Sequence, residues 1–151
     1  MIDNCTSSDV SNADLLRKKM QSGQALTETE ITAFERGACT INMLNRIEAK
    51  QAELSQLMND YSYRNSIVTK THTNGDILSD ADYIRIVNNL DRLKAAYYTY
   101  STTPTTPMYM YGYQEANAIE KILVDVESMI VSMESKFRQC GTFQCGEENV
   151  N

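Results

Sequence analysis

Two long stretches of this chain carry apolar residues at alternating steps of three and four, the spacing that forms a continuous hydrophobic stripe along an α-helix. The first stripe consists of Tyr83, Ile86, Leu90, Leu93, Tyr97 and Tyr100. The second consists of Ala116, Ile119, Leu123, Val126, Ile130, Met133 and Phe137. Helices with such stripes bury them against one another, so we expect the two stretches to pair lengthwise as an antiparallel helical hairpin.

A third long helix is predicted to follow Thr27. Thr27 and Glu30 have the spacing of a capping box, in which each side chain accepts a hydrogen bond from the other residue's backbone. Apolar residues then recur at helical spacing as far as Tyr61, with charged residues between them. Gly37 interrupts this pattern, and either allows the close approach of another backbone or is a tolerated interruption that costs up to about 1 kcal/mol.

A short helix is predicted near the N-terminus. Ser11 stands three residues before Asp14 and opens an amphipathic segment that runs from Leu15 to Met20. Gly23 can end this helix by adopting the left-handed conformation after the last turn.

The period changes between residues 66 and 78. Ile67 and Val68 precede a run of threonines that includes Thr71, and Asn74-Gly75 is the preferred dipeptide of a tight hairpin turn. This pattern predicts a small β-hairpin or an extended arm. Two strands alone are marginally stable in water, so the arm is expected to lie on the helices or on another chain and is a candidate contact element.

The fold class that follows is mainly α: a helical bundle of three long helices plus a short N-terminal helix, with a small β-hairpin arm around residues 66–78. We expect residues 1–138 to form a single helical domain, with an inserted arm at 64–79 and a proline-containing linker at 101–112. Residues 139–151 are polar and are expected to be a C-terminal tail. A chain of 151 residues is long enough to bury one core.

Charge and patterning argue against several classes of partner. There are 20 acidic and 14 basic residues, and the net charge of about −6 disfavours nucleic acid and anionic lipid. The triplet Arg17-Lys18-Lys19 is the best basic cluster, and it is typical of a solvated helix face. Charged residues interrupt every apolar run, and the N-terminus lacks the pattern of a secretion signal, so we expect a soluble protein with reduced cysteines.

No residue pattern points to catalysis or to a cofactor. The single histidine, His72, lies in the threonine-rich segment beside Lys70 and is expected to be exposed. Phosphate-binding loops, zinc-protease motifs and nucleophile elbows are missing from the sequence. Cys140 and Cys145 leave a local disulfide or half of a metal site open, but further ligands at matching spacing are not evident. We therefore expect no enzyme activity, no cofactor, no metal and no small-molecule substrate.

Tyrosine and methionine are concentrated around the proline linker. Both residue types are enriched at protein interfaces, because they bury large areas and adapt to wet or irregular surfaces. The predicted partner-binding residues are Tyr97, Tyr100, Met108, Tyr109, Met110, Tyr111 and Tyr113, together with Ile67, Val68 and Thr71 of the arm. The alternative is that the linker side chains fold back and seal the end of the helical hairpin.

In general character the chain resembles the small helical connector and ring proteins of tailed bacteriophage virions, including those of crAss-like phages. The resemblance is carried by TETEITAF at the start of the long helix, THTNGD in the arm, STTPTTPMYMYGY in the linker and the polar tail. It implies a virion structural protein at the head-tail junction, in contact with other copies of itself and with portal or tail components. The alternatives are a cytoplasmic helical regulatory module that binds proteins, and a minor capsid-associated or head-fibre protein.

Overall fold

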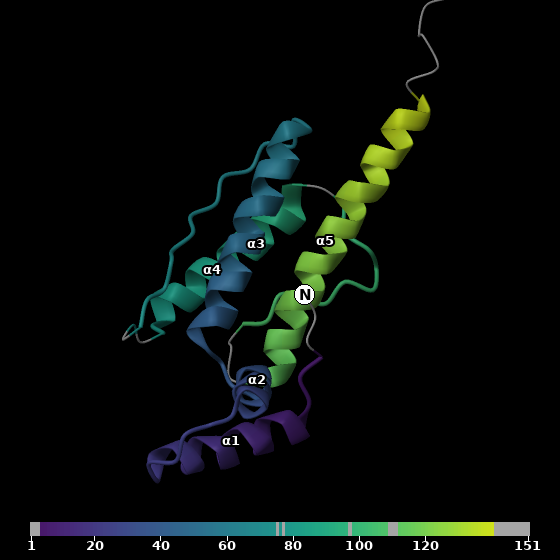
Figure 1. Ribbon diagram of the computed structural model, residues 1–151. Coiled ribbons are helices and arrows are strands. Elements are labelled where there is room, and N and C mark those ends of the chain that lie inside the picture. The colour runs from purple at the N-terminus through teal and green to yellow at the C-terminus, as the bar shows by residue number, and fades with distance from the viewer. Residues whose placement is uncertain (1–3, 75, 77, 97, 109–111, 141–151) are drawn as a thin grey trace, which may run out of the picture.

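In the residues that it describes, the computed structural model has five α-helices, and the prediction of a mainly α fold is confirmed (Figure 1). It describes residues 4–74, 76, 78–96, 98–108 and 112–140, the last four without their side chains. The helices are α1 (Ser7–Gln21), α2 (Glu28–Gly37), α3 (Ile41–Asp60), α4 (Asp80–Ala96) and α5 (Tyr113–Cys140). Within these ranges no residue is in a β-strand, and no helix is long and apolar enough to cross a membrane.

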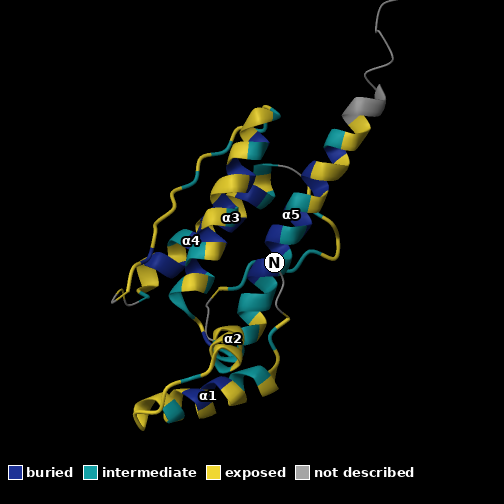
Figure 2. Ribbon diagram, viewed as in Figure 1, coloured by how far each residue is buried: buried dark blue, intermediate teal, exposed yellow. Residues whose placement is uncertain are grey.

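The hydrophobic core is shared by α3, α4 and α5. Both apolar stripes of the sequence supply it, and dark bands of buried residues mark it along the three helices (Figure 2). Its fully buried side chains are Ile47, Leu54, Ile86, Leu90, Leu93, Ile119, Ile122 and Leu123. Tyr100 lies beyond the end of α4, while Tyr97 and the Phe137 side chain fall outside the described residues.

The three core helices run in the same direction, which differs from the predicted antiparallel hairpin. Arg46 of α3 pairs with Glu120 of α5, and Lys50, one turn further along, pairs with Glu127. Residue numbers thus increase in the same direction along α3 and α5, and the two helices are parallel. Figure 1 shows α4 also starting near the α2 end of α3, so both connections must return along the length of the bundle.

The helix predicted over residues 28–61 is in fact two helices, α2 and α3. Ala38 is extended, with φ −112° and ψ 143°, and the Thr40 side chain caps α3 by accepting a hydrogen bond from the Met43 N–H at 3.2 Å. The break allows α2 to pack on α1, and these two helices lie together at one end of the molecule (Figure 1). Thr40 therefore starts a new helix although the apolar residues continue at helical spacing on both sides of it.

Gly37 lies at the closest approach between α1 and α2. A Cβ atom at this position would stand 2.0 Å from the Asp9 carbonyl oxygen and 2.9 Å from the Ala13 Cβ. Close approach of another backbone, one of the two alternatives drawn from the sequence, is therefore the role of this glycine.

Helix α1 begins earlier than predicted, at Ser7. Thr6 and Asp9 form a capping box ahead of the predicted cap at Ser11, whose hydroxyl instead donates to the Ser7 carbonyl. Gly23 adopts the left-handed conformation after the helix, with φ +82°, as predicted.

The predicted β-hairpin is not formed by the described residues. Residues 63–73, which we call the arm, are extended but contain no strand, and they run along the outside of α3 and α4 (Figure 1). Gly75, the second residue of the predicted turn, lies outside the described residues. The arm has no partner strand because side chains of the helices supply its hydrogen bonds.

Candidate protein-contact surfaces

Side chains of α4 and α5 fix the linker between these helices. Lys94 donates from Nζ to the Pro104 carbonyl at 3.1 Å, and the Tyr83 hydroxyl donates to the Pro107 carbonyl at 2.8 Å. The Thr103 hydroxyl donates to Asp125 of α5 at 2.9 Å. Thr106 also donates to Asp91 of α4 at 2.5 Å, so the linker is held at several points across the surface of the helices.

The fixed linker exposes large side chains. Tyr98 is 73% exposed, Met108 is 80% exposed and Tyr100 is 37% exposed, and we call these three residues the linker surface. Tyr113 is half-buried at the start of α5. The other predicted linker residues, Tyr97, Tyr109, Met110 and Tyr111, lie outside the described residues.

Tyr98 was not among the predicted contact residues, although it is the more exposed of the two described tyrosines in this surface. The heptad pattern gave no reason to select it, because Tyr98 falls between the stripe positions 97 and 100. Helix α4 ends at Ala96, so the stripe does not govern the direction of side chains that follow it.

Two asparagines hold the arm by pairing with its backbone as a neighbouring strand would. Asn89 of α4 donates to the Val68 carbonyl at 2.8 Å and accepts from the Val68 N–H at 3.3 Å. Asn45 of α3 makes the same two bonds with His72, at 2.9 and 2.7 Å. Each side-chain amide thus satisfies both backbone groups of one arm residue.

Further bonds continue the same two-residue period along the arm. The Lys70 N–H donates to Glu48 at 3.1 Å, and the Ser66 carbonyl accepts from Arg92 at 2.6 Å. All bonds to residues 66, 68, 70 and 72 therefore lie on one edge of the arm. Of the predicted contact residues here, Ile67 is half-buried, while Val68 and Thr71 are exposed.

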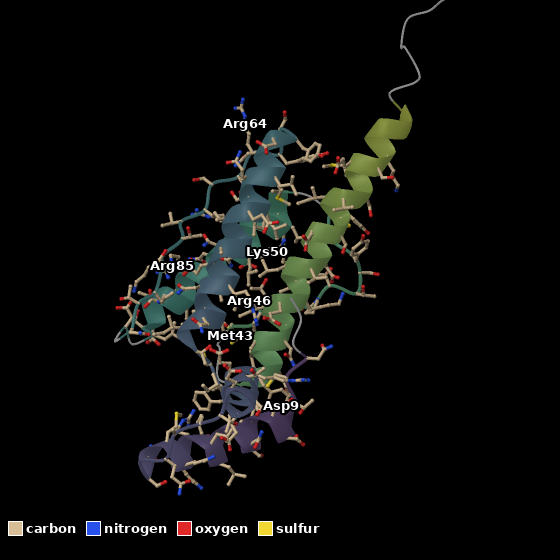
Figure 3. All side chains as sticks on the ribbon, in the orientation of Figure 1. Asp9, Met43, Arg46, Lys50, Arg64 and Arg85 are labelled. Carbon is tan, nitrogen blue, oxygen red and sulfur yellow. The ribbon has the colours of Figure 1, made fainter. Side chains whose placement is uncertain are left out.

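A buried charge cluster lies between the arm, α3 and α4. Glu48 is 2% exposed and accepts from Arg85 at 2.5 Å, and Arg85 also donates to Asp82 at 2.8 Å. The bonds to Glu48 raise the pKa of Arg85. Hydrogen bonds from Ser79, and then from Arg85, hold the pKa of Asp82 well below its usual range. Figure 3 shows Arg85 beside the arm, where it joins the two carboxylates.

His72 is buried in this cluster, so the expectation that it is exposed is wrong. It is 3% exposed, and its Nε2 lies 3.4 Å from Glu48 Oε1 without forming a hydrogen bond within the described structure. The bonds from Asn45 fix its backbone, and this turns the ring inward. Neighbouring residues in the sequence gave no sign of burial, because the partners of His72 are more than twenty positions away.

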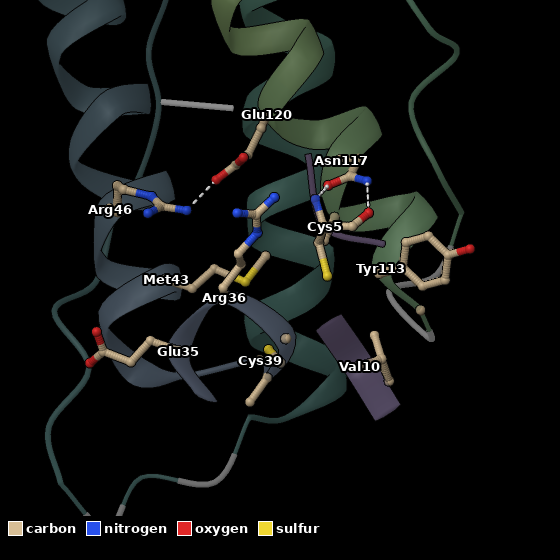
Figure 4. Close-up of a pocket in the computed structure, with 14 residues that line it drawn as sticks. Cys5, Val10, Glu35, Arg36, Cys39, Met43, Arg46, Tyr113, Asn117 and Glu120 are labelled. Atoms are coloured by element: carbon tan, nitrogen blue, oxygen red, sulfur yellow. Dashed lines mark hydrogen bonds and ion pairs between the residues drawn. The ribbon is translucent and has the colours of Figure 1, made fainter. Parts of the chain in front are cut away.

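A cavity of about 200 Å³ lies where α1 and α2 meet α3 and α5. Figure 4 shows Cys5, Cys39 and Arg46 lining it from three different sides. Asn117 closes one wall by bonding both backbone groups of Cys5, at 3.1 and 2.8 Å. The volume is below the roughly 300 Å³ at which pockets for small ligands begin, so the cavity is better described as a packing junction.

The Cys5 Sγ donates a hydrogen bond to the Thr6 carbonyl at 3.7 Å, and desolvation raises the pKa of the Cys39 thiol. In the part of the chain that the structure describes, no three His, Cys, Asp or Glu side chains are grouped as metal ligands. The predicted alternatives for Cys140 and Cys145 concern side chains outside that part.

Comparisons with protein-family models, with curated protein sequences and with solved structures find no match for this chain.

Proposed function

We propose that this protein acts by binding other protein chains, as a structural component of a tailed-phage virion at the head-tail junction. The observation that carries the contact function is the linker surface. Tyr98, Tyr100 and Met108 are exposed on a backbone that helix side chains already fix. Binding there immobilises little additional chain, which lowers the entropic cost of association.

The phage assignment rests on the resemblance of the sequence, and the long fixed connectors support it. A virion component must present the same contacts in every copy, because closed assemblies reuse the same patches. Copies of this chain and portal or tail proteins are the proposed partners.

The contact function is tested by the mass of the full chain in solution, measured by light scattering over a range of concentrations in reducing buffer. The double variant Tyr98→Ser, Met108→Ser should weaken association at least about tenfold and keep its helicity, because two exposed anchors are lost without a change to the core. Ile84→Ser is the matched control, since Ile84 is a large apolar residue that is 55% exposed on α4 and is not part of the linker surface. Equal weakening by the control would contradict the role of the linker surface.

The virion assignment has a separate test. Mass spectrometry of purified phage particles should detect peptides of this chain at a fixed ratio to the portal protein. Its absence from intact particles, with abundant protein in the infected cell, would contradict the assignment.

A further inference from the structure

The outer edge of the arm is unpaired between residues 67 and 71, within the part of the chain that the structure describes. In an extended chain the N–H and C=O groups of successive residues point to opposite sides. The helices bind residues 66, 68, 70 and 72, so the backbone groups of Ile67, Thr69 and Thr71 point to the other side. Among the described residues none makes a hydrogen bond to these outward groups.

This edge has the properties of an edge strand with unpaired backbone groups. Figures 1 and 2 show the arm along the outside of α3 and α4, and Val68, Thr69 and Thr71 are exposed. Residues 67–69 and 71 are β-branched, as is typical of strands. The inner bonds already hold the arm extended, so pairing requires little further ordering.

We propose that the arm pairs with the same arm of a second copy of this chain, antiparallel about a two-fold axis at Thr69. In this register Thr69 faces Thr69 of the second copy, and Ile67 faces Thr71. Each of these facing pairs exchanges two N–H···O bonds, because all three residues direct their backbone groups outward. The bonded edge thus spans residues 67–71 of both copies.

Side-chain chemistry favours this register over its neighbours. It places Lys70 opposite Val68 and threonine opposite threonine, a favourable cross-strand pair. A register centred on Ile67 would set Arg64 opposite Lys70, two like charges. It would also need the backbone groups of Asn65, which Asn59 already binds at 3.0 and 3.2 Å.

A register centred on Thr71 is also less favourable. It would set Lys70 opposite His72, a residue that is 3% exposed and enclosed by the helices. Lys70 itself is bound to Asp82 at 3.3 Å, so its charge is partly balanced when it faces Val68.

The pairing is isologous and closes on two copies. It deepens the proposed function, because it names one contact between copies, and it is independent of the linker surface. A higher assembly would use the linker surface as a second, different contact.

The first test compares Thr69→Pro with Thr69→Val by light scattering of the full chain. Proline removes the outward N–H and leaves the inner bonds of Val68 and Lys70 in place, while valine keeps both the N–H and the shape. Two bonds are lost per dimer, so Thr69→Pro should raise the dissociation constant about thirtyfold. Thr69→Val loses only the side-chain contact between the two threonines and should raise the dissociation constant by no more than about fivefold.

The second test covers the case in which proline disturbs the arm. Facing Cα atoms of a bonded antiparallel pair are about 5.5 Å apart, within the range of a disulfide. Under mild oxidation Thr69→Cys should therefore give a cross-linked dimer above the level of the wild-type chain. Thr71→Cys should not, because its two Cα atoms would lie about 14 Å apart.

Two results would overturn the inference. One is a Thr69→Pro variant whose dissociation constant equals that of the wild-type chain. The other is equal cross-linking of Thr69→Cys and Thr71→Cys. If association then still depends on Tyr98 and Met108, the proposed contact function stands and the arm pairing alone fails. A wild-type chain that stays monomeric at its highest soluble concentration contradicts the arm pairing, whereas the proposed contacts with portal or tail proteins would still stand.

Discussion

Replacing Asn89, Asn45 and Asn59 one at a time with alanine measures how the arm is held. Each asparagine makes the same pair of bonds to one arm residue, from Nδ2 to its carbonyl and from its N–H to Oδ1. The three sites differ in burial: Asn89 is 2% exposed, Asn45 is half-buried and Asn59 is exposed. The series therefore compares the same pair of arm bonds at three levels of burial.

The expected cost is largest at Asn89. Its Nδ2 also donates to Gln51 Oε1 at 3.1 Å, and Gln51 is 0% exposed. The alanine variant leaves that oxygen buried without its donor, which costs about 1–3 kcal/mol, and loses two further bonds worth about 1 kcal/mol between them once water replaces them. Asn89→Ala should thus lower the free energy of unfolding by about 2–4 kcal/mol.

At Asn59 water can replace both bonds, so the loss should stay below about 1 kcal/mol, with Asn45 between the two. Urea unfolding followed by circular dichroism measures all three values. Hydrogen exchange of residues 65–73 should accelerate in Asn89→Ala before global unfolding, because the arm loses its central attachment. Equal losses at Asn59 and Asn89 would refute the argument that burial sets the strength of these attachments.

Four further substitutions, one of them a control, test other parts of the structure. Gly37→Ala should lower the free energy of unfolding in urea by about 1–3 kcal/mol, because the added Cβ disturbs the packing of α1 on α2. Gly112→Ala is the control and should be nearly neutral. Its Cβ would meet only the end of the flexible Glu115 side chain, at 2.9 Å. Glu48→Ala removes the buried partner of an arginine and should cost about 3 kcal/mol by the same measurement. The pKa of Asp82 is lowered in the folded state, so its contribution is present above its unfolded pKa of about 4 and is lost as the pH falls below that value. Asp82→Asn should therefore flatten the dependence of stability on pH below about 4, and an unchanged slope would contradict the assignment.

The sequence was most informative where local periodicity and tertiary packing agree. The stripe residues Ile86, Leu90, Ile119 and Leu123 are all fully buried, since an amphipathic helix of this length has one way to remove its apolar face from water. The same reasoning could not give helix direction, because a stripe packs equally well in parallel and antiparallel pairs. The linker is long enough for either arrangement of the two helices, so the prediction that they pair antiparallel is wrong.

The arm shows where local sequence reasoning ends. Its β-branched residues correctly indicate extended backbone, but the hairpin required a partner strand from the next few residues. The partners are instead amides of Asn45 and Asn89, which lie 27 and 21 positions away from the residues they bind. His72 is buried because residues distant in the sequence contact it. Glu48 binds Lys70 and Arg85, which are also distant in the sequence, and the sequence pattern did not single it out.

Parallel helices account for both candidate contact surfaces. Helix α4 has 17 residues and is about 26 Å long at 1.5 Å per residue, so the chain must cover a comparable distance to return from the end of one helix to the start of the next. Such a returning segment runs over the surface, and its backbone N–H and C=O groups need hydrogen-bond partners outside a helix. One edge of the arm is satisfied by helix side chains, and its other edge faces outward by the alternation of an extended chain. An antiparallel hairpin would close with a short turn and expose neither edge. The direction of the helices therefore leaves an outward backbone edge in the arm, and removal of the Thr69 N–H is the perturbation that tests whether a second copy pairs with it.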